Sequence, residues 1–240
     1  MDKVKALKIP QEKIEKVLVS RPVFLERVAD FRTILIILVA SFATLTIFVK
    51  SFPYFQFDLT ITRSIQNFRP AWFDFMMVLV SRLGDANIGS LIIVAFIVLA
   101  LLTRKIKTAG MIGFTCFSMT VINQTFKFLV SRPRPSMSGL VQVVGIFKRS
   151  DSFPSGHVMF YVGLYGFLIY IVYTQFRKTN QLRQFLIILF SLMIFLVGIS
   201  RIYLGAHWFS DVLGAYLLGF SWLIVCIWIY NKLDPNVKPK

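Results

Sequence analysis

The sequence is poor in the residues that build cross-linked or metal-centred folds. It contains two cysteines and two histidines among 240 residues. Cys116 and Cys226 both lie inside apolar stretches, so the sequence predicts neither a disulfide framework nor a cysteine-based metal motif. Because imidazoles are so few, the positions of His157 and His207 call for an explanation.

Acidic residues are scarce as well. There are 11 Asp and Glu against 27 Lys and Arg, which gives a formal net charge of +16. Such basicity can indicate nucleic-acid binding, but 56% of the residues are apolar and the mean hydropathy is +0.70. In membrane proteins, Lys and Arg gather in cytoplasmic loops and near anionic headgroups. The composition therefore predicts an integral membrane protein and no nucleic-acid partner.

The first 32 residues show no cleavable signal pattern, because the first apolar run starts behind a charged leader without a small-residue cleavage site. Apolar residues recur in this leader at helical spacing around Pro22. This spacing indicates a short amphipathic helix on the membrane surface, with disorder as the alternative. We predict a cytoplasmic leader over 1–32, a membrane domain over 33–230 and a cytoplasmic tail over 231–240.

Six apolar segments approach the roughly 20 residues that span a bilayer. They cover residues 33–50, 87–103, 108–130, 157–175, 184–202 and 207–230. Prolines and charged residues interrupt 51–86, where we expect helices in or near the membrane interface; a short seventh span over 71–82 is the alternative. The predicted fold class is an all-α membrane protein with a bundle of six transmembrane helices and additional interfacial helices.

Basic residues orient this bundle. With the N-terminus in the cytoplasm, 17 of the 27 Lys and Arg lie in the leader, in the loops 103–108 and 175–184, and in the tail. We therefore predict a multi-pass protein of the plasma (inner) membrane with both termini in the cytoplasm. The ends of the third and fifth spans and the starts of the fourth and sixth then face outside.

Polar clusters stand at these outer ends. The third span ends in KFLVSRPRP, where two prolines stop the helix and several cations, including Lys127 and Arg134, reach one small volume. The fourth begins at PSGH, where Ser155 is a good N-cap, Gly156 lets a ligand approach the backbone, and the helix start favours a bound phosphate. Each cluster alone is also typical of snorkelling cations or an ordinary cap.

The cluster SRIYLGAHWFSD joins the fifth and sixth spans. His207 and Asp211 are four residues apart, so the carboxylate can hold the imidazole in one tautomer. Gly205 and Ala206 allow a helix break that lets Arg201 approach His207; an interfacial belt of Trp and His is the alternative. Together, the clusters suit one task, in which cations neutralise a phosphate, one imidazole attacks phosphorus and the other protonates the leaving oxygen.

The three clusters resemble the ordered motifs of the type 2 phosphatidic acid phosphatases (PAP2), the lipid phosphate phosphatases. These motifs are K-x6-RP, PSGH and SR-x5-H-x3-D, and all three are complete here. The resemblance covers about residues 85–230, and the six-helix layout matches that of a PAP2-type bundle. It implies a metal-independent phosphatase that uses no cofactor and forms a phosphohistidine.

The resemblance also implies a role for each motif residue. His207 is the nucleophile, Asp211 orients it, and His157 is the general acid. Arg132 is an extra cation beside the first motif, without a catalytic role. The implied phosphate-binding residues are Lys127, Arg134, Ser155, Gly156 and Arg201.

The expected reaction is hydrolysis of a lipid phosphomonoester or diphosphate at the outer membrane face. Undecaprenyl diphosphate, phosphatidate and phosphatidylglycerophosphate are the candidate substrates, and the outer loop 136–153 with Lys148 and Arg149 is placed to read the headgroup. The expected partners are this phosphorylated lipid and the surrounding membrane lipids; the oligomeric state is not indicated. The alternatives are a lipid-to-lipid phosphotransferase with the same phosphohistidine, a lipid A phosphatase and, least favoured, a non-catalytic lipid-binding protein.

Overall fold

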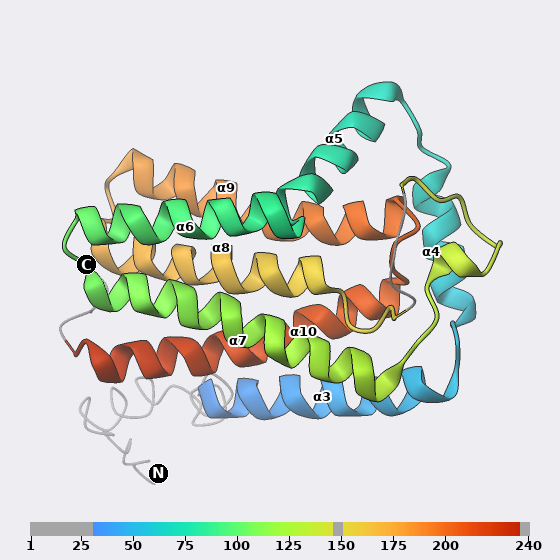
Figure 1. Cartoon of the computed structure of the whole chain (residues 1–240), viewed down its shortest axis with the longest axis horizontal. Helices are drawn as coiled ribbons and strands as arrows, with labels where there is room; N and C mark the ends of the chain where they lie inside the picture. The colour runs from blue at the N-terminus through green and yellow to red at the C-terminus, as the bar shows by residue number, and fades with distance from the viewer. Residues whose placement is uncertain (1–30, 146–150, 236–240) are drawn as a thin grey trace, which may run out of the picture. The chain divides into compact units, whose positions relative to one another are not determined.

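The computed structural model describes residues 31–145 and 151–235. In this part of the chain the regular elements are helices, with one isolated β-bridge between Pro133 and Asp151. The predicted all-α membrane class is therefore confirmed (Figure 1). The helices are α3 (Phe31–Ser51), α4 (Gln56–Gln66), α5 (Ala71–Leu83), α6 (Ala86–Leu102), α7 (Ile106–Val130), the 3-10 helix η1 (Pro135–Met137), α8 (Gly156–Gln175), α9 (Gln181–Tyr203) and α10 (Phe209–Leu233).

The chain divides into two compact units, residues 1–37 and 38–240. The described part of the first unit is the start of α3, and the rest of α3 and all later helices belong to the second. The predicted amphipathic helix of the leader falls outside the described residues, apart from Phe31 and Arg32. The predicted headgroup readers Lys148 and Arg149 also lie outside them.

Six of the helices coincide with the six predicted spans, and their ends differ from the predicted ones by at most three residues. Apolar helices suit a bilayer because they satisfy their backbone hydrogen bonds internally. Four of them, α3, α8, α9 and α10, are long and apolar enough to cross a membrane alone. The more polar α7 is not among these four, although its 25 residues are sufficient in length.

Residues 51–86 form the two short helices α4 and α5, as the interruptions in this region predicted. Pro53 lies between α3 and α4, and Pro70 is the N-cap residue of α5. α5 and α6 together qualify as one span, but they are bent by 63° at the link formed by Gly84 and Asp85. Figure 1 shows α5 turned away from the axis of α6. The bend places the link beside the start of α8, where Gly84 approaches the side chains of His157 and Tyr161.

α8 is the central helix of the bundle. It packs against α7, α9 and α10, and 13 of its 20 residues are buried. A helix that is apolar on all sides is typical of such a position. Because α8 is held on several sides, its first turn has a well-defined place relative to its neighbours.

The three motifs meet at one end of this bundle. There the C-terminal ends of α7 and α9 and the N-terminal ends of α8 and α10 come together (Figure 1). α4 packs against α9 and α10 at the same end. The fold thus gathers segments that are far apart in the sequence around one candidate site.

Candidate active site

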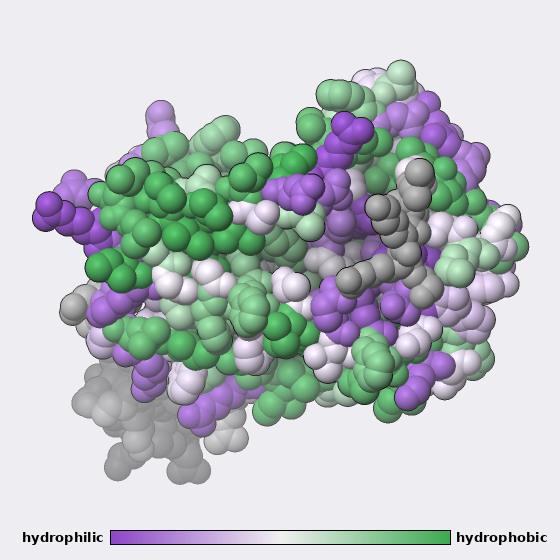
Figure 2. Space-filling view, viewed as in Figure 1, coloured by the Kyte–Doolittle hydropathy of each residue, from purple (hydrophilic) through white to green (hydrophobic). Residues whose placement is uncertain are grey.

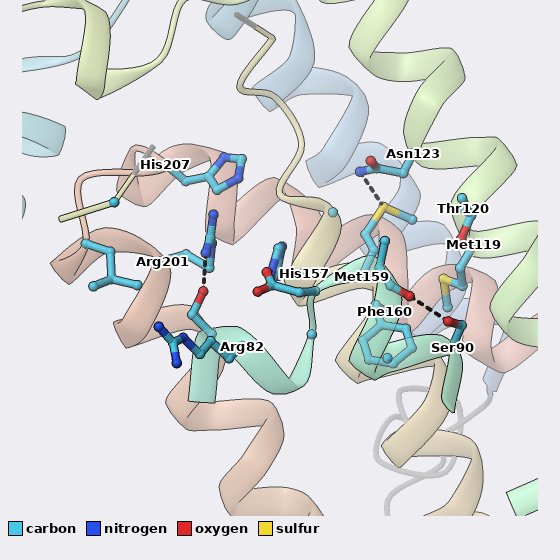
Figure 3. A pocket seen from close by; sticks show the side chains of 18 of the residues that line it. Arg82, Ser90, Met119, Thr120, Asn123, His157, Met159, Phe160, Arg201 and His207 are labelled. Carbon is cyan, nitrogen blue, oxygen red and sulfur yellow. Dashed lines mark hydrogen bonds and ion pairs between the residues drawn. The ribbon is translucent and has the colours of Figure 1, made fainter. Parts of the chain in front are cut away.

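A cavity of about 900 Å³ lies at this end of the bundle. Two of the predicted site residues, Ser155 and Asp211, are buried and do not line it. In Figure 3, Arg201 and His157 lie around the same space as His207. The predicted site residues that do line the cavity are Lys127, Arg134, Gly156, His157, Arg201 and His207.

His207 lies in the turn between α9 and α10, and 1% of its surface is exposed. Gly205 makes this turn possible with a φ of +68°, a conformation that side chains with a Cβ disfavour. The N–H groups of Ala206 and His207 both donate to the carbonyl of Arg201, at 3.1 and 3.2 Å. The small residues therefore produce the predicted break, and it places His207 back beside the end of α9.

The two ring nitrogens of His207 face different partners. Nδ1 lies 3.6 Å from Oδ2 of Asp211 and 3.4 Å from the hydroxyl of Ser152. Nε2 lies 3.3 Å from Nη1 of Arg134, which also donates to the carbonyl of Ala206 at 2.8 Å. A guanidinium can only donate, so this network favours the tautomer with the proton on Nδ1 and the lone pair on Nε2.

The environment of His207 keeps its imidazole neutral. Burial lowers the pKa of His207 well below the usual 6.5, and the positive charges of Arg134, Lys127 and Arg201 lower it further. The nucleophilic form of the ring is therefore populated at neutral pH, with its lone pair directed toward the cation of Arg134.

Asp211 belongs to a buried charge network that the sequence did not predict. Its Oδ1 accepts a hydrogen bond from Arg132 at 2.6 Å, and its Oδ2 accepts from Ser152 and from the N–H of Trp208. Arg132 also donates to Asp58 of α4 at 3.0 Å. Arg132 thus connects two carboxylates that are both fully buried. The side chain that appeared to be an extra cation holds the partner of His207 in place.

The cationic wall of the cavity is largely buried. Lys127 is 6% exposed and donates to the carbonyl of Asp151 at 2.8 Å. Arg201 is 5% exposed and donates to Ser81 of α5. Buried cations act at a lower effective dielectric than surface ones, so they stabilise an anion more strongly.

Ser155 departs from its expected capping bond. It occupies the N-cap position of α8, as predicted, but its side chain makes no cap hydrogen bond. Its hydroxyl is buried, and it has no hydrogen-bond partner among the described residues. A buried hydroxyl without a partner is costly, so it is suited to a ligand that accepts a hydrogen bond beside the first turn of α8.

His157 is the second residue of α8 and lines the same cavity as His207 (Figure 3). Its Nε2 lies 3.1 Å from Oδ1 of Asp85, in the link between α5 and α6. Asp85 and Arg82 also line the cavity. Neither was identified from the sequence, where their only signal was that acidic and basic residues interrupt an apolar region.

Beyond these charged groups, apolar side chains and the uncharged polar side chains of Ser90, Thr120, Asn123 and Gln124 line the cavity. Its lining there comes from α6, α7 and α8, and Figure 3 shows Met119, Met159 and Phe160 beyond His157. Figure 2 shows hydrophilic residues gathered near the motif end and hydrophobic residues covering much of the rest of the visible face. A molecule with a phosphorylated head and an apolar tail matches this order along the cavity, in which charged side chains come first and Met119, Met159 and Phe160 lie beyond them. Among the described residues, no group of three His, Cys, Asp or Glu could hold a metal ion.

Comparison with known proteins shows which protein family this chain matches. Residues 108–235 match the model of the PAP2 superfamily. Phosphatidylglycerophosphatase B of Bacillus subtilis (strain 168) is 28% identical over 181 residues, which cover 75% of this chain and 85% of that protein. Dolichyldiphosphatase 1 of Homo sapiens is 29% identical over 160 residues, or 61% of this chain and 64% of that protein.

Two solved structures share the fold. The crystal structure of a PAP2-type phosphatidylglycerolphosphate phosphatase from Bacillus subtilis aligns with a TM-score of 0.70 at 24% identity, covering 85% of this chain and 97% of that one. Aquifex aeolicus LpxE aligns with a TM-score of 0.55 at 23% identity, covering 74% of this chain and 96% of that one. The fold of this chain is therefore one that other solved proteins share.

Proposed function

The chain belongs to the PAP2 superfamily, whose model covers more than half of it, and on this premise we propose that it is an integral membrane phosphatase acting on a lipid phosphomonoester or diphosphate. The supporting observation is the setting of His207. Its Nε2 faces Arg134, while Nδ1 faces Ser152 and Asp211. A phosphoryl group held by the cations would meet the lone pair of a neutral, oriented imidazole.

The proposed reaction has two steps. First, Nε2 of His207 attacks phosphorus, the bond from phosphorus to the lipid oxygen breaks, and protonated His157 gives its proton to that oxygen. The products are a phosphohistidine and a lipid that has lost one phosphoryl group: the free alcohol from a phosphomonoester, or the lipid monophosphate from a diphosphate. Second, neutral His157 takes a proton from water as the water oxygen attacks phosphorus and the bond from phosphorus to Nε2 of His207 breaks, which releases inorganic phosphate and restores both histidines.

The cations stabilise the charge that develops on the phosphoryl oxygens. Lys127, Arg134 and Arg201 approach the cavity from three segments of the chain. The hydroxyl of Ser155 and the N–H groups of the first turn of α8, from Gly156 onward, complete the proposed phosphate site. Asp211 stabilises the cationic character that His207 acquires during the attack.

The apolar side chains in the part of the cavity beyond His157 support a lipid as the substrate. A tail lying between α6, α7 and α8 could stay in the bilayer while the phosphate reaches the histidines. Phosphatidylglycerophosphate and an isoprenyl diphosphate are both compatible with this shape, as the names of the relatives also suggest. We propose that the membrane domain, residues 33–230, carries out this reaction.

A phosphate-release assay on purified protein in detergent tests the proposal. Undecaprenyl diphosphate, phosphatidate and phosphatidylglycerophosphate should be compared, with lipid products separated in parallel. We expect free phosphate from at least one of them, also in excess EDTA, because side chains form the whole cationic site. Transfer of the phosphate to another lipid would instead indicate a phosphotransferase, and no turnover of any of the three would contradict the proposal.

The acid limb of the pH profile should report the charges around His207. Replacing Arg134 with Gln removes a positive charge that lowers the pKa of His207, so this pKa should rise. The neutral ring is then lost at a higher pH, and the acid limb of kcat/KM should move upward, with an amplitude lower by about 10²-fold. Because the ionisation of the substrate is the same for both proteins, coinciding acid limbs would contradict the assignment of His207.

Cysteine labelling tests the proposed orientation, in which the protein lies in the inner membrane and its site faces the side away from the cytoplasm. The native cysteines are buried, so labelling background should be low. We expect Met137→Cys, at a position that is 65% exposed near the site, to react with a membrane-impermeant maleimide on intact cells. Thr179→Cys, between α8 and α9, should react only after permeabilisation. The reverse pattern would show that the orientation is wrong.

A further inference from the structure

The side chain of Asp85, in the link between α5 and α6, contacts His157 of α8 and does not cap α6. Asp85 occupies the N-cap position of α6, where a carboxylate usually accepts a backbone N–H of the first turn. Its side chain makes no such bond. Oδ1 lies instead 3.1 Å from Nε2 of His157, 72 residues away in the sequence. Asp85 therefore bonds to a residue that lines the cavity, and the capping bond to the first turn of α6 is not made.

Gly84 brings the link close enough for this contact. A Cβ at this position would lie 2.7 Å from Cδ2 of His157 and 2.8 Å from the ring of Tyr161. The backbone therefore lies directly against the imidazole, and only glycine fits without a shift of these rings. The hydroxyl of Tyr161 donates to the carbonyl of Val80 at 2.6 Å, which anchors α8 to α5 on the same side.

We propose that Asp85 is a positioning residue for His157 and that the two form a second carboxylate–imidazole pair in the site. The inference rests on the proposed function, in which His157 protonates the lipid oxygen. With Nε2 held by Asp85, Nδ1 is the nitrogen that gives up the proton. The same carboxylate stabilises the imidazolium that must exist before the bond to phosphorus breaks.

The other charges around His157 make this stabilisation necessary. Two guanidiniums face the ring, Arg201 from α9 and Arg134 from the segment after α7. Two further titratable groups lie near the ring: His207, which is held neutral, and Tyr161, whose hydroxyl donates to the carbonyl of Val80. Asp85 is the acidic side chain that acts on His157 among the described residues. It therefore offsets the repulsion that the phosphate-binding cations exert on a protonated His157.

Asp85→Asn tests the proposal by comparing two leaving groups. An alkyl oxygen needs a proton to leave, whereas p-nitrophenolate leaves without one. We expect the variant to lose about 10²-fold in kcat/KM on phosphatidate but less than about threefold on p-nitrophenyl phosphate, because only the first reaction depends on general-acid catalysis. On phosphatidate the basic limb of the pH profile should also move to lower pH, since the imidazolium loses its stabilising carboxylate.

Two variants serve as controls. Asp74→Asn removes a carboxylate near the other end of α5, which bonds to Arg69 and Tyr203 and does not line the cavity; it should keep wild-type selectivity between the two substrates. Asp85→Glu should restore part of the activity on phosphatidate. Equal losses of Asp85→Asn on both substrates, or no loss on either, would overturn the proposal.

The failure of this inference can be told from a failure of the proposed function. His157→Ala should lose activity selectively on phosphatidate, and Asp85→Asn should add little to that loss if the two residues act together. If His157→Ala retains wild-type activity on phosphatidate, the assignment of the general acid is wrong. If His157→Ala is impaired and Asp85→Asn is not, only the positioning role of Asp85 is wrong.

Discussion

The His207→Ala variant should insert and fold but lose at least about 10⁴-fold in kcat/KM on its lipid substrate, because the loss of a nucleophile removes the covalent route. The cavity would keep Lys127, Arg134 and Arg201, so inorganic phosphate should still bind. Phosphate release from the best lipid of the substrate panel measures the first effect. Thermal stabilisation of the detergent-solubilised variant by orthophosphate measures the second.

A conservative change at the far end of α8 provides the matched control. Tyr170→Phe removes one hydroxyl, which bonds to Asn231 near the end of α10, and it should leave kcat/KM at the wild-type level. Near-normal hydrolysis by His207→Ala would show that another group attacks phosphorus. Trapping of a radiolabelled phosphoenzyme in the wild type, and its absence from the variant, would give the same assignment independently of turnover.

Replacing Arg132 with Met should produce the largest loss of stability among the substitutions considered. Arg132 is the cation shared by Asp58 and Asp211, and all three side chains are buried. Removing it leaves two carboxylates without their counter-charge, which costs about 3–5 kcal/mol. We expect a lower Tm in detergent and a large fall in kcat/KM, because Asp211 no longer holds His207 in place.

A double-mutant cycle separates the pairing from general disruption. Asp58→Asn removes one of the two carboxylates, so the combination with Arg132→Met should cost less than the sum of the two single changes. Strict additivity, or a wild-type Tm for Arg132→Met, would mean that the network contributes nothing. Arg132→Lys should rescue little, because an ammonium cannot reproduce the fork that reaches Asp58, Ser210 and Asp211 together.

The spans were predictable because bilayer thickness imposes a length and a composition on each of them. This physical constraint placed all six long helices within three residues of their ends. The prolines likewise indicated where α4 and α5 are separated from their neighbours. The 63° bend between α5 and α6 was not predictable, because it depends on the packing of Gly84 against His157 and Tyr161.

The motif residues could be predicted because each motif is a short, ordered pattern. Six of the eight predicted residues share the cavity. The residues that support them form no recognisable sequence motif. Asp58 and Arg132 are 74 positions apart, and nothing in their spacing indicates that they are in contact. For Ser155, helix-capping rules predicted the position correctly, but the expected bond is missing, and the buried hydroxyl has no partner in the part of the chain that the structure describes.

The contacts that α4, α5 and the link to α6 make with the motif end bear on how short an active fragment of this chain can be. The family signature begins at residue 108, and every motif lies downstream of that point. Asp58, Ser81 and Asp85 lie upstream of it and hold Arg132, Arg201 and His157, respectively. A polypeptide trimmed to residues 108–235 would keep every motif residue but lose these three contacting side chains. We therefore expect that an active fragment of this chain must start no later than α4.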